Sequence, residues 1–369
     1  MLRKAVFPGK YVQGVGAINE LPALIKLLGT RSAILVSPSV IEKALPKCNL
    51  DLESQGHRIE LFRGECCEEE LDRLLSVVDQ SHSDVIVGMG GGKTIDTAKI
   101  VADRAEVPVI IVPTIASTDA PCSGCAVLYT KDGIFDSVCY QRANPAAVLV
   151  DLSIIAEAPT RFLVSGMGDA LSTWFEARSC HLTKSPNECG GLSTMAGLHL
   201  AKLCYETLLT YGVAAMTAND DRIVNTALDH IVEANTLLSG LGFESAGLAS
   251  AHSIHNGLTA LIETHSFFHG EKVAFGVLSG LQLTDADAEE IDAVHSFCES
   301  IGLPTTLDDI GLRDVSRERL MIAAEKACAP GQPIHHEAGI VTPERVLDAM
   351  LAADAMGRVR RGEKGHRHE

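Results

Sequence analysis

The feature that most constrains this chain is a glycine-rich turn between an apolar run and a helical pattern. Residues 85–87 are apolar and lead into Gly88-Met89-Gly90-Gly91-Gly92-Lys93-Thr94, after which apolar residues recur at helical spacing through residue 102. Glycines let the backbone approach a ligand closely, and N–H groups at a helix start attract anions. The stretch predicts a strand, a phosphate-binding turn and a helix, with Lys93 as an added cation. A tight turn without a ligand is the alternative.

Two familiar phosphate-binding patterns almost fit this turn. The dinucleotide pattern Gly-x-Gly-x-x-Gly needs a glycine at position 93, where Lys93 stands, and the P-loop pattern needs a glycine at position 87, where Val87 stands. The turn is therefore a phosphate cradle of another kind, and a diphosphate is its natural ligand.

The composition narrows the class of protein. The 369 residues are 46% apolar and 21% charged, which is ordinary for a globular protein large enough for two domains. The net charge of −17 argues against nucleic acid or an anionic membrane as partner. No apolar run is long enough to span a bilayer, and no apolar signal-peptide core follows the basic start. With 11 scattered cysteines, a cytoplasmic protein with reduced thiols is expected.

Residues 1–160 alternate between strand and helix patterns. Helices are expected over 16–28 and 68–78, and strands are expected over 33–36, 58–62, 85–87, 107–112, 126–129 and 147–150. Apolar strands that alternate with helices predict a parallel sheet covered on both faces. Ligands of such sheets bind beyond the carboxyl ends of the strands, which is where the glycine turn lies.

Residues 161–369 are expected to form a second, all-helical domain. Helical patterns cover 169–182, 191–212, 219–239, 246–263, 271–282, 287–301, 316–328 and 343–358. Gly240 and Gly242 are expected to break the pattern. The charged tail from Arg358 to Glu369 is expected to fray.

A second polar loop follows the strand pattern at 107–112. It reads Pro113-Thr114-Ile115-Ala116-Ser117-Thr118-Asp119-Ala120-Pro121-Cys122-Ser123. Hydroxyls and a carboxylate at a strand end suit hydrogen bonds to phosphates, a ribose or a polyol. The alternative is a helix N-cap around residues 117–119. The Cys122-x-x-Cys125 pair could also be a redox pair or half of a zinc site, but nucleotide contact explains the loop better.

A possible metal site comes from one carboxylate and the histidines of the second half. Asp169 stands at an expected helix start, His252 and His255 share one small-residue helix, and His269 opens the next helix. Imidazole plus carboxylate is a ligand set for zinc or iron(II), and three ligands leave a position open for substrate. The alternatives are an N-cap aspartate and hydrogen-bonded core histidines. His335 and His336 are expected at the surface or between the domains.

The motifs together resemble a known family. The segments that carry the resemblance are Phe7–Tyr11, Gly88–Lys99, Pro113–Ser123, Gly166–Arg178, Glu233–Thr236, Gly242–Ser245 and His269–Phe275. They resemble the glycerol dehydrogenase branch of the metal-dependent alcohol dehydrogenases, the iron-containing type, over nearly the whole chain. The resemblance implies a dehydroquinate synthase-like fold, with an α/β Rossmann-like domain over 1–160 and an all-α domain over 161–369.

The resemblance also implies roles for particular residues. It assigns the metal to Asp169, His252 and His269, with one zinc ion per subunit and Fe²⁺ or Mn²⁺ as other options. It assigns the polyol to Asp119 and His252, which would also be the catalytic residues. It assigns the nucleotide to Ser37, Gly90, Gly91, Gly92, Lys93, Thr94, Thr114, Ser117, Ser123, Cys125 and Tyr129.

The activity implied is the reversible, NAD-dependent and zinc-dependent oxidation of glycerol and other 1,2-diols to dihydroxyacetone and other hydroxyketones. The active site would lie in the cleft between the domains of a homo-oligomer, often an octamer in this family. A polyol-phosphate or hydroxycarboxylate dehydrogenase on the same scaffold is the alternative enzyme. A nucleotide-binding protein without catalysis is the alternative outside enzymes.

Two positions depart from the family pattern. Ser37-Pro38 stands where the family often has an aspartate that binds the adenosine ribose, so discrimination against NADP should weaken. Cys125 replaces a larger apolar residue beside the nucleotide and could make the enzyme sensitive to oxidation. His255 is expected either to orient the metal site, to relay a proton or to pack.

Overall fold

The computed structural model describes residues 1–48, 50, 52 and 54–362, and the chain divides into two compact units. The sheet unit contains Phe7–Phe162 and Ala218–Gly240, and the helical unit contains Met1–Val6, Leu163–Thr217 and Leu241–Glu369. The units therefore differ from the two predicted domains at two segments. Residues 1–6 join the helical unit because the backbone of Lys4 donates to Leu192 O at 3.1 Å. Residues 218–240 join the sheet unit, where Tyr11 Oη lies 2.7 Å from Thr236 Oγ1.

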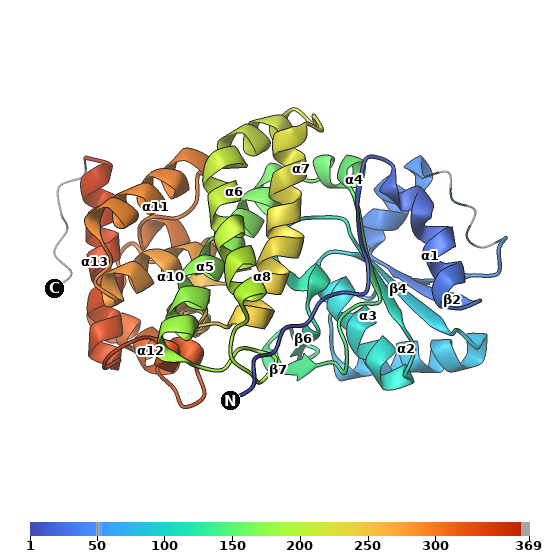
Figure 1. The fold of residues 1–369 in the computed structure, drawn as a ribbon, viewed down its shortest axis with the longest axis horizontal. Coiled ribbons are helices and arrows are strands. Elements are labelled where there is room, and N and C mark those ends of the chain that lie inside the picture. The colour runs from blue at the N-terminus through green and yellow to red at the C-terminus, as the bar shows by residue number, and fades with distance from the viewer. Residues whose placement is uncertain (49, 51, 53, 363–369) are drawn as a thin grey trace. The chain divides into compact units, whose positions relative to one another are not determined.

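The sheet unit is built on six parallel strands (Figure 1). Their order across the sheet is β1-β8-β5-β4-β2-β3. Their bounds are β1 (Tyr11–Gly14), β2 (Ser32–Val36), β3 (Arg58–Leu61), β4 (Val85–Gly90), β5 (Val109–Pro113) and β8 (Ala147–Asp151). The predicted parallel α/β fold is confirmed. Strand β1 was not predicted because its four residues are only half-buried and form no apolar run.

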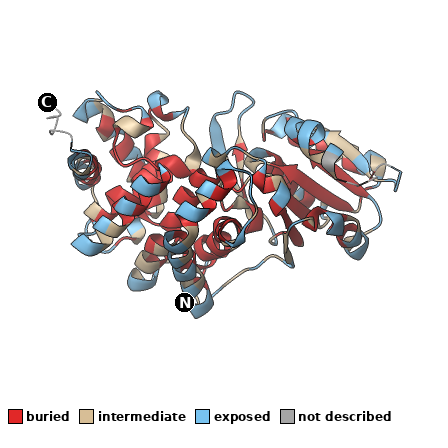
Figure 2. Ribbon diagram, turned by 90° about the horizontal axis from the view of Figure 1, so that it is seen from above, coloured by how far each residue is buried: buried red, intermediate tan, exposed pale blue. Residues whose placement is uncertain are grey.

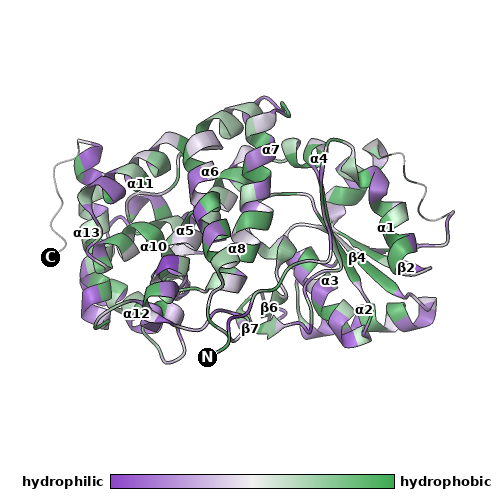
Figure 3. Ribbon diagram, viewed as in Figure 1, coloured by the Kyte–Doolittle hydropathy of each residue, from purple (hydrophilic) through white to green (hydrophobic). Residues whose placement is uncertain are grey.

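Helices cover both faces of this sheet. Helix α1 (Leu21–Leu28) packs on the face that carries Ile34, Val87 and Ile110. Helices α2 (Glu68–Ser81) and α3 (Gly92–Ala105) pack on the opposite face, beside Leu35 and Ile86. Double cover explains why every residue of β2, β4, β5 and β8 is buried, as Figure 2 shows in red, and why the strands are strongly hydrophobic in Figure 3.

The strand register brings three loop starts to one edge of the sheet. Val36 of β2 pairs with Met89 of β4, and Gly90 of β4 pairs with Pro113 of β5. Because the strands are parallel, the segments that follow β2, β4 and β5 all leave from the same edge. The predicted nucleotide residues Ser37, Gly91 and Thr114 begin these three segments.

One of the strands predicted for the parallel sheet belongs instead to a separate antiparallel hairpin. Residues 126–129 were expected in the parallel sheet, but β6 (Cys125–Tyr129) pairs only with β7 (Phe135–Tyr140) among the described residues. A short 3-10 turn, η4 (Ala120–Cys122), precedes β6. Strand β7 was not predicted because four of its six residues are exposed, so it shows no apolar run.

The other regular elements of the described chain are helices and helical turns. In the sheet unit lie α4 (Leu152–Ala156), α7 (Thr226–Glu233) and the π-helical turn η5 (Ala234–Leu238). The longer helices, most of them in the helical unit, are α5 (Thr160–Thr183), α6 (Met195–Asp220), α8 (Ser239–Ala246), α9 (Ser250–Leu258), α10 (His269–Leu283), α11 (Ala288–Ile301), α12 (Arg317–Ala327) and α13 (Pro343–Arg360). No helix among the described residues combines the length and apolar character that a membrane span requires.

One expectation about helix ends was wrong, and another is tested only in part. Helix α8 runs through Gly240 and Gly242, which are small because neighbours come close: a Cβ would lie 2.9 Å from Asp119 O at Gly240 and 2.5 Å from Thr173 Cγ2 at Gly242. The predicted frayed tail is helical through Arg360, and its last seven residues, 363–369, lie outside the described residues.

Candidate functional site

The helical unit brings together one carboxylate and two imidazoles that could hold a metal ion. Asp169 lies on α5, His252 on α9 and His269 on α10, and one donor atom from each lies within 4.8 Å of the others. Asp169 Oδ1 is 3.1 Å from His269 Nε2 and 3.5 Å from His252 Nε2. An oxygen and two imidazole nitrogens fit zinc or another first-row divalent ion, and three protein donors leave room for a further ligand.

Close backbone contacts bring the three helices together beside these donors. Gly168 and Gly270 meet where α5 and α10 cross, because a Cβ on either glycine would collide with backbone atoms of the other helix. Gly276 meets Ala251 in the same way where α10 crosses α9. Each contact adjoins a donor in sequence: Gly168 precedes Asp169, Gly270 follows His269 and Ala251 precedes His252.

Asp169 is not an N-cap residue. Helix α5 begins at Thr160, so Asp169 lies well inside the helix, and it is fully buried. Burial opposes ionisation of this carboxyl, but the neighbouring His269 and His252 outweigh it and hold the pKa of Asp169 below its ordinary value. A buried carboxylate inside a helix needs polar partners, and the two imidazole rings provide them.

His252 is held in place by a second buried carboxylate, Glu176. Glu176 Oε2 lies 2.6 Å from His252 Nδ1, and Glu176 Oε1 accepts the backbone N–H of His252 at 3.0 Å and of Ala249 at 2.9 Å. Burial alone would lower the pKa of His252, but Glu176 and Asp169 together raise it well above the ordinary value. A metal ion would displace the proton from Nε2, while the contact with Glu176 keeps the proton on Nδ1 and so directs Nε2 at the metal position.

His269 is supported by a chain of neutral groups. His269 Nδ1 lies 3.0 Å from His255 Nε2, His255 Nδ1 lies 3.1 Å from Asn256 Oδ1, and Asn256 donates to Gln332 Oε1 at 3.0 Å. Burial, together with His269 and Lys272, lowers the pKa of His255 well below its ordinary value, so His255 is neutral and can accept from His269. The orienting role expected for His255 therefore has a matching contact.

Arg178, His265 and His336, which lie near these helices in sequence, form hydrogen bonds with residues outside the donor set. Arg178 makes two hydrogen bonds with Glu290, at 2.7 and 2.9 Å. His265 is exposed and bonds Thr259 O. His335 is exposed, as expected, whereas His336 is half-buried and bonds Leu248 O at 2.7 Å.

The sheet unit brings the predicted nucleotide residues to one edge. Ser37 N donates to Met89 O at 3.2 Å and Thr114 N donates to Gly90 O at 3.0 Å, so the segments after β2 and β5 flank the glycine turn. Asn235 donates to Ala116 O at 3.0 Å and holds the loop that carries Ser117. These contacts place Ser37, Thr114 and Ser117 near the glycine turn.

The glycine turn has the shape of a cradle. A Cβ at Gly90 would lie 2.8 Å from Thr94 Cβ and Oγ1, so this glycine is needed for the turn itself. A Cβ at Gly91 would lie 3.0 Å from Ile115 Cδ1, whereas nothing lies within 4 Å of a Cβ at Gly92. The space beside Gly92, at the N-terminus of α3, is therefore open, and a phosphate there would meet backbone N–H groups.

Lys93 has a partner that the sequence did not reveal. Its ammonium pairs with Glu65 Oε2 at 2.6 Å and lies 4.8 Å from the ring centroid of Tyr129. The cation predicted to face a phosphate is thus already neutralised by a carboxylate. Side-chain exposures of 43% for Lys93 and 19% for Glu65 leave the pair accessible from solvent.

A buried lysine shapes the second polar loop. Lys99 is 1% exposed and donates to Ala120 O at 2.9 Å, to Ser123 O at 3.3 Å and to Cys125 O. These three carbonyls curve around one ammonium, which fixes the segment that carries Ser123 and Cys125. Cys125 Sγ donates to Ser123 Oγ at 3.5 Å, and all eleven cysteines are free thiols, so the CxxC motif forms no disulfide.

Asp119 lies in the same loop and is largely buried. Its Oδ2 accepts from Ser239 Oγ at 2.9 Å. Asp119 directly precedes η4, but its side chain makes no capping hydrogen bond, so the N-cap alternative is wrong for this residue.

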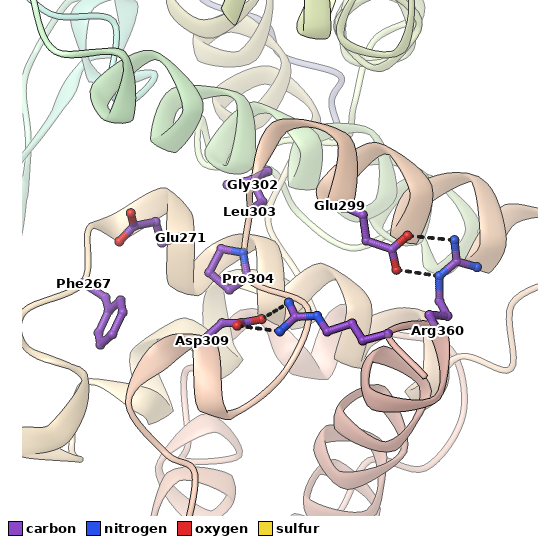
Figure 4. Close-up of a pocket in the computed structure, with 9 residues that line it drawn as sticks. Phe267, Glu271, Glu299, Gly302, Leu303, Pro304, Asp309 and Arg360 are labelled. Atoms are coloured by element: carbon purple, nitrogen blue, oxygen red, sulfur yellow. Dashed lines mark hydrogen bonds and ion pairs between the residues drawn. The ribbon is translucent and has the colours of Figure 1, made fainter. Parts of the chain in front are cut away.

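A cavity of about 520 Å³ in the helical unit contains none of the predicted site residues. Figure 4 shows two ion pairs in its lining, Glu299 with Arg360 and Asp309 with the neighbouring arginine. Phe267 and Glu271, which stand two residues to either side of His269, form part of its wall. Because both lining arginines are paired with carboxylates, this cavity gives no indication of an anionic ligand.

Comparison with known proteins identifies the family. The family described as iron-containing alcohol dehydrogenase matches residues 8–152. Glycerol dehydrogenase of Thermotoga maritima is 53% identical over 98% of this chain and 99% of that protein. Glycerol dehydrogenase of Pseudomonas putida is 48% identical over 95% of this chain and 96% of that protein. The chain belongs to the iron-containing alcohol dehydrogenase family, as the sequence motifs predicted.

The fold agrees with this assignment. The crystal structure of a probable glycerol dehydrogenase from Sinorhizobium meliloti 1021 matches with a TM-score of 0.91 at 46% identity, covering 97% of this chain and 99% of that one. The matched chains are nearly complete on both sides, so the likeness extends over both units.

Three residues with functional contacts were missed by sequence reasoning. Glu176 could have been found, because it stands seven residues after Asp169 and therefore shares its face of a helix. Glu65 and Lys99 give no such signal, because their partners are distant in sequence and paired only by the fold.

Proposed function

We propose that this chain catalyses the reversible NAD-dependent oxidation of glycerol, and of other 1,2-diols, to dihydroxyacetone and the corresponding hydroxyketones. The observation that carries the proposal is the donor set of Asp169, His252 and His269, in which both imidazoles turn Nε2 toward one carboxylate. The relatives described as glycerol dehydrogenases supply the substrate class. The overall reaction converts glycerol and NAD⁺ to dihydroxyacetone, NADH and a proton.

Zinc is the ion proposed for the donor set, with Fe²⁺ and Mn²⁺ as other candidates. Such an ion supplies Lewis acidity, which makes an alcohol oxygen easier to deprotonate near neutral pH. Asp169, His252 and His269 hold it, Glu176 fixes the ring of His252, and His255 fixes the ring of His269. Glu176 and His255 are not proposed as metal ligands. Each determines which nitrogen of the neighbouring imidazole is available to bind the metal ion.

NAD is the proposed hydride acceptor, with its diphosphate on the glycine turn. Gly90, Gly91, Gly92 and Thr94 supply the shape of the turn and its backbone donors, and Lys93 supplies a charge once it leaves Glu65. Ser37 is assigned to the adenosine side. Thr114 and Ser117 follow β5, whereas Ser123, Cys125 and Tyr129 lie before or on β6, where the Tyr129 ring is 4.8 Å from the Lys93 ammonium. All five are assigned to the rest of the nucleotide.

Asp119 is proposed to bind a hydroxyl of the polyol. Replacing it in the variant Asp119→Ala removes a charged acceptor, so the KM for glycerol should rise about tenfold, as expected for one hydrogen bond to a charged group. The KM for NAD should change much less. Steady-state kinetics with each substrate varied in turn make the comparison, and equal increases in both constants would remove the assigned role.

The proposal is tested by metal removal followed by a substrate panel. Chelation should abolish NAD reduction by glycerol, and stoichiometric Zn²⁺ should restore it; full activity in a metal-free protein would refute the metal role. A panel of diols, 2-hydroxy acids and glycerol phosphate separates the alternative enzymes. A phosphorylated substrate would need a cation to bind its phosphate, and Arg178 is already paired with Glu290, which argues against such a substrate.

The homo-octamer implied by the family resemblance and the cytoplasmic location expected from the scattered cysteines stay predictions. Light scattering of the purified protein measures the first, and fractionation of cells measures the second.

A further inference from the structure

The segment that follows β2 lacks the acid that would favour NAD over NADP. In nucleotide-binding sheets a carboxylate at this strand end binds the 2′-hydroxyl of the adenosine ribose and repels a 2′-phosphate. Here Ser37 follows Val36, and its hydroxyl lies 3.1 Å from the hydroxyl of Ser39. Because Ser37 N donates to Met89 O of β4, these two hydroxyls lie beside the strand that leads into the glycine turn.

The adjacent strand end carries a cation. Phe62 N donates to Val36 O at 2.8 Å, so the backbone continues alongside β2 beyond the last paired residue of β3. Arg63 is the next residue, and it is exposed. Arg63 therefore leaves β3 at the edge where Ser37 leaves β2.

The carboxylates around Arg63 are already engaged with other cations. Glu60 pairs with Arg73 at 3.1 Å and Glu70 pairs with Arg73 at 2.8 Å, while Glu65 pairs with Lys93. Glu70 Oε1 accepts the backbone N–H of Arg63 at 3.1 Å, and no contact between Glu70 and the Arg63 guanidinium is found among the described residues. Among the described residues, none accepts a hydrogen bond from the Arg63 guanidinium, which is thus available for an anion.

We propose that Ser37, Ser39 and Arg63 form a subsite for the 2′-phosphate of NADP, so that the enzyme uses NADP as well as NAD. This inference rests on the nucleotide site proposed above. A guanidinium matches the geometry of a phosphate and bonds it through two N–H groups, and serine hydroxyls add neutral donors. The three residues that directly follow β2, Ser37-Pro38-Ser39, include no carboxylate that would repel the extra charge.

The test measures binding of two ligands that differ only in the phosphate of interest. Adenosine 5′-monophosphate and adenosine 2′,5′-bisphosphate are titrated calorimetrically into the full-length enzyme. The bisphosphate should bind about tenfold more tightly, as expected for a charge-assisted hydrogen-bond pair. In Arg63→Gln this advantage should disappear while the affinity for the monophosphate stays unchanged.

Two further variants sharpen the test. Arg58→Gln removes another exposed arginine from β3, one that already pairs with Glu60, and should leave the advantage intact. Ser37→Asp should reverse the preference, because it restores the repelling carboxylate. Fluorescence titrations with NADH and NADPH should give the same order.

The outcomes separate this inference from the proposed function. Equal binding of the two adenosine ligands by the unaltered enzyme, or an advantage that survives in Arg63→Gln, would overturn the subsite while leaving NAD-dependent glycerol oxidation in place. A protein that binds neither NADH nor NADPH would overturn the nucleotide site and the subsite with it.

Discussion

The glycine turn and the metal-donor cluster are built in opposite ways. The turn is one continuous stretch, Gly88 to Thr94, and its donors are backbone N–H groups that any glycine-rich helix start provides. The cluster takes single side chains from three helices, and Asp169 and His269 are 100 residues apart. A site made of backbone can be recognised from local sequence, whereas a site made of side chains exists only once the helices pack.

The two regions also differ in what supports them. The cation of the turn, Lys93, is half-exposed and pairs with Glu65, which is accessible to solvent. The donor His252 is instead held by a fully buried carboxylate that contacts both its ring and its backbone N–H, and the same carboxylate accepts the backbone N–H of Ala249. Substitutions in the cluster should therefore cost far more than substitutions in the turn.

The largest effect is expected from Asp169→Asn. It removes the one anionic donor and leaves two imidazoles facing an amide, so metal affinity should fall by more than the roughly 10–100-fold typical of a supporting residue. Metal content after dialysis measures this. Asp220→Asn, at the exposed end of α6, is the matched control and should keep its metal. A fully metallated Asp169→Asn protein would place the metal elsewhere.

Glu176→Gln should have the next largest effect. An amide cannot accept all the hydrogen bonds that the carboxylate accepts, so His252 loses its fixed orientation and metal affinity should fall roughly 10–100-fold. Competition with a chromophoric chelator gives the affinity, and the absorption spectrum of the Co²⁺ form reports the geometry. Glu206→Gln, an exposed change on α6, is the control. An unchanged affinity and spectrum would show that Glu176 only caps α9.

Two neighbouring glycines test the turn. Gly90→Ala places a Cβ 2.8 Å from Thr94, so it should lower the free energy of unfolding by about 1–3 kcal/mol, as overpacking does. Gly92→Ala meets no atom within 4 Å, so its Tm should match that of the unaltered protein while NADH binds more weakly. Thermal unfolding and fluorescence titration distinguish the two. Unchanged NADH affinity in Gly92→Ala would argue that no phosphate lies beside it.

The smallest effect is expected from Glu65→Gln. It frees Lys93 from a pair in solvent contact, and such pairs contribute about 0.2–1 kcal/mol, so NADH should bind up to about fivefold more tightly. The gain should shrink as salt is added, because screening weakens an exposed cation. Glu69→Gln, exposed on α2, controls for net charge. Weaker NADH binding would mean that Glu65 positions Lys93 rather than competing for it.

The parts of the fold that could be predicted are those with continuous apolar runs. Strands β2, β4, β5 and β8 are buried on both faces, so nearly every residue is apolar and the runs stand out. Strands β1 and β7 are half-buried or exposed, and their mixed sequences resemble loops. Residues 1–6 and 218–240 belong to the opposite unit from the one predicted. Their placement depends on contacts between segments that are distant in sequence, which no local pattern encodes.

The candidate site likewise has a part that local sequence predicts and a part that depends on contacts between distant segments. The turn was predicted from its glycines, whereas the donor set came from family resemblance, and its setting was misread. Gly166 and Gly168 suggested a helix start at Asp169, but α5 runs through them. Gly168 is small because α10 touches it, and a contact of that kind is indistinguishable in sequence from a chain break.

The glycine contacts between α5, α9 and α10 have a consequence for how this site can change over time. The spacing of the donors is set where main chain meets main chain, at Gly168 with Gly270 and at Gly276 with Ala251. Substitutions in the surrounding apolar core can therefore accumulate without moving the donors. Conversely, a different metal-binding side chain introduced at position 169 or 269 would have the same backbone spacing. Natural selection or protein design can therefore change the chemistry of the site by changing the side chains alone.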